Sequence, residues 1–165
     1  MLRAVIVCLA VVCACEPRNS YVLPEAFAGP VVVIWEDPHG QPIGDDRRVN
    51  IPRDGVAFVR AIQPETFIAR YFVRNGNKEV RLEYEEPNPS LYQAFGAKTA
   101  VGALGCSPRE IKYETFLIGR TKERAKLETE LLARLQQGMV STMKHHGELH
   151  AAECFAHQPL WIFRF

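Results

Sequence analysis

The chain carries no surplus of either charge, and beyond its first segment it has no long hydrophobic run. Its 165 residues include 20 Lys and Arg against 19 Asp and Glu, a formal net charge of +1. Binding to nucleic acid would call for a basic stripe, so this balance argues against a nucleic-acid partner. A transmembrane helix needs about 20 consecutive apolar residues. No later segment approaches that length, so the sequence predicts no further membrane span.

The short motifs of common catalytic and cofactor sites are also missing. None of the serines lies in a Gly-x-Ser-x-Gly elbow, and the chain has no Gly-x-Gly-x-x-Gly and no Cys-x-x-Cys after residue 15. No pair of acidic residues is placed by a pattern that would separate a general acid from a general base. The sequence therefore implies no cofactor, and it favours a non-enzymatic domain without settling the point.

The first fifteen residues, MLRAVIVCLAVVCAC, are the most informative segment that is present. Arg3 supplies a positive start, and the apolar run from Ala4 to Val12 has the length of a signal-peptide core. The run ends at Val12-Cys-Ala-Cys15, which resembles the lipobox of bacterial lipoproteins. By that resemblance residues 1–14 are a signal peptide and Cys15 becomes the lipidated first residue of the mature chain. An ordinary secretory signal and an uncleaved apolar anchor are the alternatives.

A lipid on Cys15 would decide where the protein works. Two or more acyl chains hold a protein stably on a membrane. Residues 15–20 would then form a short polar tether, and the domain would face the periplasm or the cell surface from the cell membrane or the outer membrane. Cleavage would remove Arg3, leaving 19 basic and 19 acidic residues. The membrane would be a partner through the lipid alone.

Cysteine usage fits export. Of five cysteines, Cys8 and Cys13 would leave with the signal and Cys15 would carry lipid. The remaining pair, Cys106 and Cys154, would meet an oxidising compartment, so we expect a disulfide between them. Two unrelated buried thiols are the alternative.

The mature region reads as strands followed by a helix. The β-branched run Val31–Trp35 and the hairpin signal Asn75-Gly76 are typical of strands and their turns. Strands are expected at residues 31–35, 48–51, 56–62, 66–73, 78–84, 111–118 and 160–163, with 91–107 irregular or a weak strand. A helix with Thr121 as N-cap is expected to run to about His145, because its apolar residues recur at spacings of three and four.

This order of elements predicts the fold class. Strands first and a helix late favour an antiparallel sheet covered by a helix over a parallel βαβ arrangement. We therefore expect residues 21–165 to form a single α+β or mainly β domain, with an antiparallel, sandwich-like sheet and one amphipathic helix packed on it.

The start of the mature chain also resembles a known group of proteins. The stretch Tyr21-x-x-Pro-Glu-x-Phe-x-Gly29, followed by a β-branched strand, is similar to the beginning of an uncharacterised family of short bacterial lipoproteins. A Pro-x-Asp-Gly turn before an aromatic strand (Pro52–Gly55) and an aromatic-to-glycine stretch before the helix (Tyr113–Gly119) fit the same family. The resemblance implies a lipoprotein and brings no activity or functional residues with it.

The tail holds the most tempting cluster of metal-ligand residue types. On a continuing helix His146, His150 and Cys154 would share one face, as zinc ligands often do. Gly147 interrupts such a helix, however, and Cys154 is claimed by the expected disulfide. The sequence therefore predicts no metal site, and His146 and His150 are kept as the candidates if one exists.

These observations predict a membrane-anchored lipoprotein with a non-enzymatic binding or structural domain and a partner protein in the cell envelope. Two alternatives stay open. One is a metal-dependent hydrolase that uses the tail histidines. The other is an envelope protein that binds an apolar ligand between sheet and helix.

Overall fold

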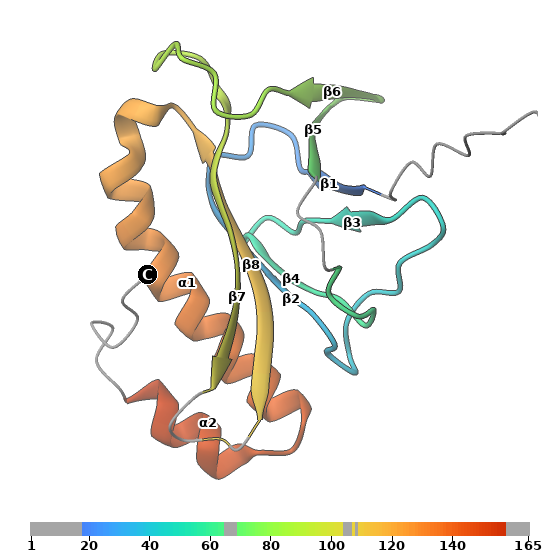
Figure 1. Cartoon of the computed structure of the whole chain (residues 1–165), viewed down its shortest axis with the longest axis vertical. Coiled ribbons are helices and arrows are strands. Elements are labelled where there is room, and N and C mark those ends of the chain that lie inside the picture. The colour runs from blue at the N-terminus through green and yellow to red at the C-terminus, as the bar shows by residue number, and fades with distance from the viewer. Residues whose placement is uncertain (1–17, 65–68, 104–106, 108, 158–165) are drawn as a thin grey trace, which may run out of the picture.

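Two four-stranded sheets and two helices make up the fold (Figure 1). The structure is a computed structural model that describes residues 18–64, 69–103, 107 and 109–157. The first sheet has the strand order β3 (Arg48–Asn50), β1 (Asn19–Leu23), β5 (Ala69–Asn75), β6 (Lys78–Leu82). The second has the order β4 (Val56–Phe58), β2 (Gly29–Ile34), β8 (Glu110–Gly119), β7 (Gln93–Ala103).

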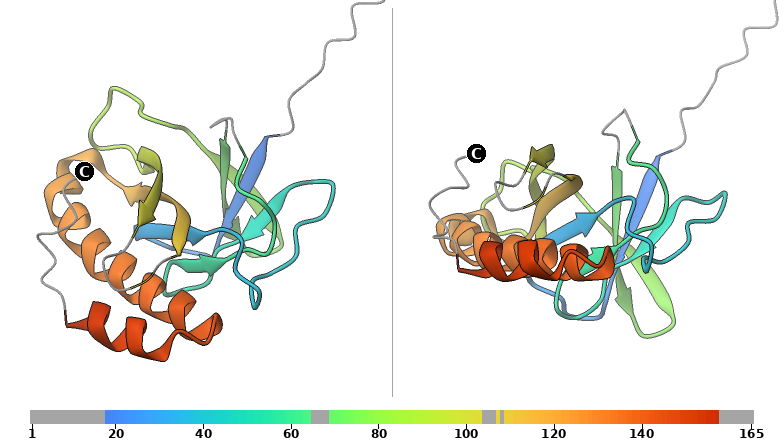
Figure 2. Two further views of the ribbon diagram at one scale, coloured as in Figure 1. Left: turned by 60° about the horizontal axis from the view of Figure 1, so that its bottom comes forward. Right: turned by 90° about the horizontal axis from the view of Figure 1, so that it is seen from below.

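The layers are sheet, sheet and helix. The long helix α1 (Arg124–His145) and the short α2 (Leu149–Ala156) lie on one side of the second sheet, and the first sheet lies on its other side (Figure 2). This arrangement confirms the predicted α+β class with strands in the majority. Among the described residues, no helix is long and apolar enough to cross a membrane.

The second sheet separates two hydrophobic cores. All six residues of β2 are buried, because alternate side chains enter different cores. Val31 and Val33 pack between the sheets, whereas Val32 and Ile34 pack against the helices. The continuous β-branched run seen in the sequence is the consequence of burial on both faces.

The predicted antiparallel arrangement is correct for only half of the strand pairs. The pairs β2–β8, β5–β6 and β7–β8 are antiparallel, whereas β1–β3, β1–β5 and β2–β4 are parallel. Parallel pairing arises because strands that follow each other along the chain enter opposite sheets. β1 and β3 belong to one sheet, and β2 and β4 belong to the other.

Several elements differ from the sequence predictions. β1 begins at Asn19, inside the segment 15–20 that was expected to be a tether. The stretch 91–107, expected to be irregular or a weak strand, contains the eleven-residue strand β7. The helix α2 was not predicted. The expected strand at 160–163 lies outside the described residues.

The ends of α1 show how the sequence begins and stops this helix. Thr121 is not its N-cap: Thr121–Glu123 form a 3-10 turn, and the Arg120 N–H donates to the Glu123 carboxylate. At the other end Gly147 has a φ of 77°, and the N–H of Glu148 donates to the carbonyl of Met143. This Schellman-type ending confirms that Gly147 interrupts the helix.

Candidate functional site

The residues named from the sequence fall in different places. Cys15 and Cys106 lie outside the described residues, and Cys154 is exposed on α2. His146 lies in the turn after α1, and His150 lies on α2, so the turn at Gly147 separates the two metal candidates. Within the described part of the chain, no group of three or more His, Cys, Asp and Glu residues could hold a metal ion.

One tail histidine does join a site that the sequence did not reveal. His145, the last residue of α1, places Nδ1 at 2.8 Å from Oδ2 of Asp37, whose side chain is fully buried. The His39 N–H donates to the other oxygen of Asp37 over 2.8 Å. The rings of His39 and His145 lie 5.0 Å apart, and Phe58 contacts His145 edge-on at 4.9 Å.

This cluster orients one imidazole. A carboxylate only accepts hydrogen bonds, so His145 Nδ1–H is the donor in this contact. The arrangement fixes the end of α1 to the loop after β2. Asp37 to Gly40 form a turn, in which the Gly40 N–H donates to the Asp37 carbonyl over 3.0 Å. The Asp–His pairing is a long-range contact with no local signal.

A polar contact joins the segment before β8 to the start of α2. The Ser107 hydroxyl and Arg109 Nε both donate to the Glu148 carboxylate, the second over 2.9 Å. These two donors hold the pKa of Glu148 below its ordinary value. The pKa of His146 is lowered by burial and, second, by the charge of Arg109. His146 is thus a half-buried neighbour of this ion pair.

A second buried carboxyl lies between the sheets. Glu114 of β8 is 1% exposed, and the Tyr21 hydroxyl donates to it. Asn19 donates weakly to the same hydroxyl over 3.4 Å, and Arg47 Nε donates to Asn19 over 2.9 Å. Burial raises the pKa of Glu114 to about 8. At neutral pH this group is mainly a neutral acid inside an aromatic core.

The family-like motifs meet around one arginine of α1. Arg134 donates to the carbonyl of Pro30, and its guanidinium lies 5.9 Å from the centre of the Phe27 ring. Gly55 has a φ of +77°, and a Cβ at that position would lie 2.1 Å from Arg134 Nη1. The Phe-x-Gly-Pro stretch and the Pro-x-Asp-Gly turn therefore make room for a helix contact, which is a structural role.

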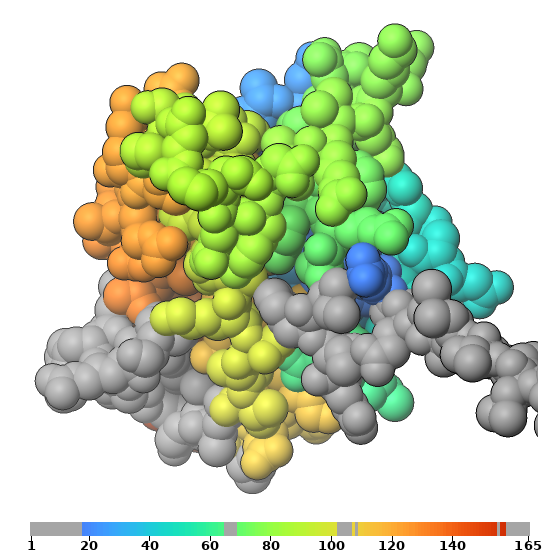
Figure 3. Space-filling model, turned by 45° about the horizontal axis from the view of Figure 1, so that its top comes forward, coloured from blue at the N-terminus to red at the C-terminus, as the bar shows by residue number. Residues whose placement is uncertain are grey.

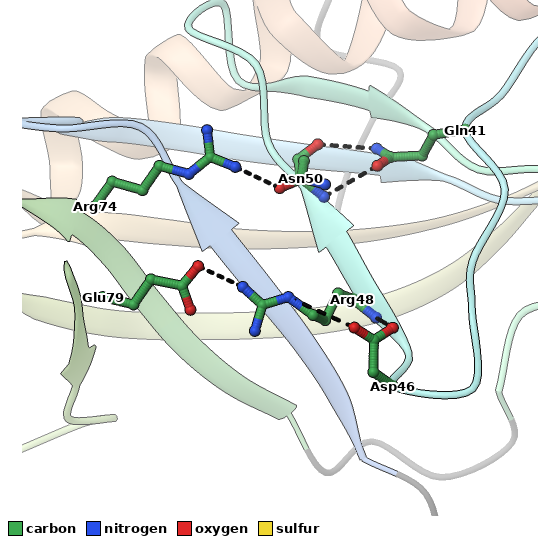
Figure 4. A network of polar contacts seen from close by, with 6 residues as sticks. All are labelled: Gln41, Asp46, Arg48, Asn50, Arg74 and Glu79. Atoms are coloured by element: carbon green, nitrogen blue, oxygen red, sulfur yellow. Dashed lines mark hydrogen bonds and ion pairs between the residues drawn. The ribbon is translucent and has the colours of Figure 1, made fainter. Parts of the chain in front are cut away.

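The outer face of the first sheet presents arginines from two strands, β3 and β5 (Figure 4). Arg48 of β3 contacts Glu79 of β6, and Arg74 of β5 donates to Asn50 over 2.8 Å. Both side chains cross β1, and this covers the outward-facing Val22, which is 1% exposed. The mutual contact raises the pKa of Arg48 and lowers that of Glu79.

A groove of about 450 Å³ runs between α1 and the strands β7 and β8. It exists because α1 lies over the other half of the sheet: a Cβ on Gly138 would approach the side chains of Ile34 and Val56 to 2.9 and 3.2 Å. In Figure 3 the first half of α1, in orange, borders the yellow-green strand β7. The groove has a floor of leucines and a charged rim, formed by Leu117, Leu131, Leu132, Lys98, Arg124 and Glu128.

A β-bulge shapes the strand side of this groove. The register of β7 against β8 shifts between Phe95 and Lys98, and Gly96 has a φ of 63°. The amides freed by the shift are bound by side chains, since Gly96 donates to Glu85 over 3.1 Å and Ala97 donates to the Tyr84 hydroxyl over 3.2 Å. Bulges are frequent next to binding sites because they re-aim side chains. The groove between sheet and helix has a mixed polar and apolar lining.

Comparison with known proteins gives a fold likeness. No protein family and no curated protein matches this sequence. Among solved structures, a candidate lipoprotein from Bacillus anthracis superposes with a TM-score of 0.50 at 14% identity. The superposition covers 64% of this chain and 71% of that one. At this level of identity the two proteins share a fold.

Proposed function

We propose that this chain is a bacterial lipoprotein, anchored through a lipid on Cys15, that displays a non-enzymatic binding domain in the cell envelope. The observation that best supports this proposal is the short distance along the chain from the lipobox-like Cys15 to the first strand. β1 begins at Asn19, so Glu16, Pro17 and Arg18 alone separate the two. Three extended residues reach only about 11 Å. Such a tether would hold the domain against the membrane surface.

The fold likeness supports this proposal. The Bacillus anthracis protein that shares the fold is itself described as a candidate lipoprotein. A lipid anchor followed by this type of sandwich would then be an arrangement common to both proteins. The sequence resemblance to short bacterial lipoproteins, carried by Tyr21–Gly29 and the Pro52–Gly55 turn, points the same way.

The outer face of the first sheet supports the binding role. It belongs to the same sheet as β1, so it would stand close to the anchor. Strand alternation places Arg70 and Arg81 on this face, in addition to Arg48 and Arg74, and both are exposed. The negative charge of Glu79 offsets only part of the positive charge of these four arginines, so the face is basic. We therefore propose that the partner is an envelope protein with an acidic surface. Complementary charge favours fast and specific association.

The tail histidines give less support to the hydrolase alternative. That alternative needs His146 and His150 one turn apart on a single helix. The structure places His146 in the turn after α1 and His150 on α2. A binding role for the groove between α1 and β7–β8 is the remaining alternative.

Metabolic labelling with an alkyne fatty acid tests the anchor. We expect wild-type protein and the matched Cys8→Ser variant to be labelled and to sediment with membranes. We expect Cys15→Ser to lose the label and to keep its signal peptide. A Cys15→Ser protein that is processed and membrane-bound like the wild type would refute the anchor.

Affinity capture from the same membranes tests the binding role. Cross-linked wild-type protein should retain a defined envelope protein, and Arg70→Glu combined with Arg81→Glu should reduce its yield at least tenfold. Lys122→Glu combined with Lys126→Glu on the helix layer is the charge-matched control. Equal yields from all three proteins would exclude the basic face as the binding surface.

A further inference from the structure

We propose that the groove between α1 and β7–β8 is occupied by the chain's own C-terminal segment, Leu160–Phe165. This segment lies outside the described residues. The inference is independent of the lipid anchor, because it rests on the helix layer and the second sheet alone.

The first argument is where the described chain ends. Gln136 of α1 donates from Nε2 to the carbonyl of Ala156, the last residue of α2, over 3.2 Å. Leu132, which lines the groove, lies one helical turn before Gln136 on the same face of α1. The end of α2 therefore lies about 6 Å along α1 from Leu132, at one end of the groove.

The second argument is length. Along α1 the groove extends from Leu132 to Arg124, which corresponds to about 12 Å of helix. The six residues Leu160–Phe165 span about 20 Å when extended. The residues between Ala156 and Leu160 can bridge roughly 13 Å, which is more than the gap requires. The segment can therefore reach the groove and fill it along its whole length.

The third argument is chemistry. The segment reads Leu-Trp-Ile-Phe-Arg-Phe, with alternating side chains large enough to cover a leucine floor. Leu132 is a half-buried apolar side chain in this groove, and Arg124 already lies 5.2 Å from the centre of the Phe95 ring. Cations at the rim can pack over further aromatic rings, and Glu128 can face Arg164. β7 is also the edge of its sheet, where an extended segment fits best.

Filling the groove from within has a consequence for binding. The leucines would be covered by the chain itself, and an apolar ligand would have to displace the segment before it could enter.

Site-specific photo-cross-linking of the full chain in its own membranes tests this proposal. p-Benzoylphenylalanine replaces Leu132 in one protein and Gln137, which is exposed on the far side of α1, in the matched control. We expect the Leu132 probe to give a monomer-sized product in which peptide 132 is joined to peptide 158–165. The Gln137 probe should give at least tenfold less of it. A product joined to lipid, to another protein or to a second copy instead of the segment would overturn the proposal.

A second variant separates docking from mere proximity. Trp161→Ser combined with Phe163→Ser in the Leu132-probe chain should lower the cross-link yield at least tenfold, while the far-ultraviolet circular dichroism stays that of the parent. An unchanged yield would overturn the apolar packing on the leucine floor.

Discussion

Glu114 is a carboxyl buried in an aromatic core. It occupies an inward position of β8 next to Phe116, whose ring lies 5.0 Å from that of Tyr21. The sequence predicted the strand but not this burial, because β8 is covered on both faces and alternation no longer separates inside from outside. The Tyr21 hydroxyl supplies a hydrogen bond, and this reduces the cost of placing a carboxyl in the core.

This burial predicts a pH-dependent stability. The pKa of Glu114 is raised from 4.5 to about 8 in the folded chain. Between these values the unfolded chain releases a proton that the folded chain keeps, so the free energy of unfolding should fall as pH rises from about 4.5 to about 8. Glu114→Gln should remove this part of the fall, because glutamine stays neutral throughout.

Urea unfolding at pH 5, 6.5 and 8 measures the effect as the difference in the free energy of unfolding between the wild type and Glu114→Gln. Glu110→Gln, an exposed position on the same strand, is the control and should follow the wild type. Parallel pH curves for wild type and Glu114→Gln would show that Glu114 ionises normally in the folded protein.

At the scale of elements, local patterns were informative and long-range pairings were not. The stripe Leu127, Leu131, Leu135, Met139 is buried as its spacing predicts, and Asn75-Gly76 forms the hairpin between β5 and β6. β7 was expected only as an irregular stretch or a weak strand, because it has small residues and a bulge. The Asp37–His145 contact was missed for a different reason: it joins two elements far apart in the chain, and neither residue signals the other.

The Asp37–His145 contact predicts a measurable coupling between α1 and the loop after β2. Asp37 is fully buried, whereas the His145 side chain is 31% exposed. Removing the histidine leaves a buried carboxylate short of one donor, so His145→Ala should lower the free energy of unfolding by about 2 kcal/mol. His150→Ala, exposed on α2, should change it by less than about 0.5 kcal/mol.

A double-mutant cycle with Asp37→Asn measures the coupling itself. The loss in the double variant should be smaller than the sum of the two single losses by at least about 0.5 kcal/mol. Strict additivity would mean that the two side chains do not interact in solution.

At the scale of the whole molecule, the sequence predicted the fold class but not how strands divide between two sheets. Nothing local tells β1 and β2 to enter different sheets, and the parallel pairs follow from that division. Because successive strands enter different sheets, many contacts join residues that are far apart in the chain. Cross-links between distant segments should therefore matter for stability.

The predicted Cys106–Cys154 disulfide is such a cross-link. Ser107, next to Cys106, donates to Glu148, one residue before α2, which carries Cys154. This contact brings the two segments together and supports the proposal that the cysteines are bonded. By closing the loop between Cys106 and Cys154, the bond should stabilise the fold by about 4 kcal/mol, mainly by restricting the unfolded chain.

Mass and unfolding measurements test the bond together. The mature protein should have a mass about two daltons below that of the reduced form, and reductant should shift its urea midpoint to that of the Cys106→Ser/Cys154→Ser double variant. The double variant itself should be insensitive to reductant. Alkylation of both cysteines in unfolded protein without reductant would show instead that they are free thiols. Stability would then rest on the two cores and on the polar contacts, such as Arg109–Glu148, that already hold α2 in place.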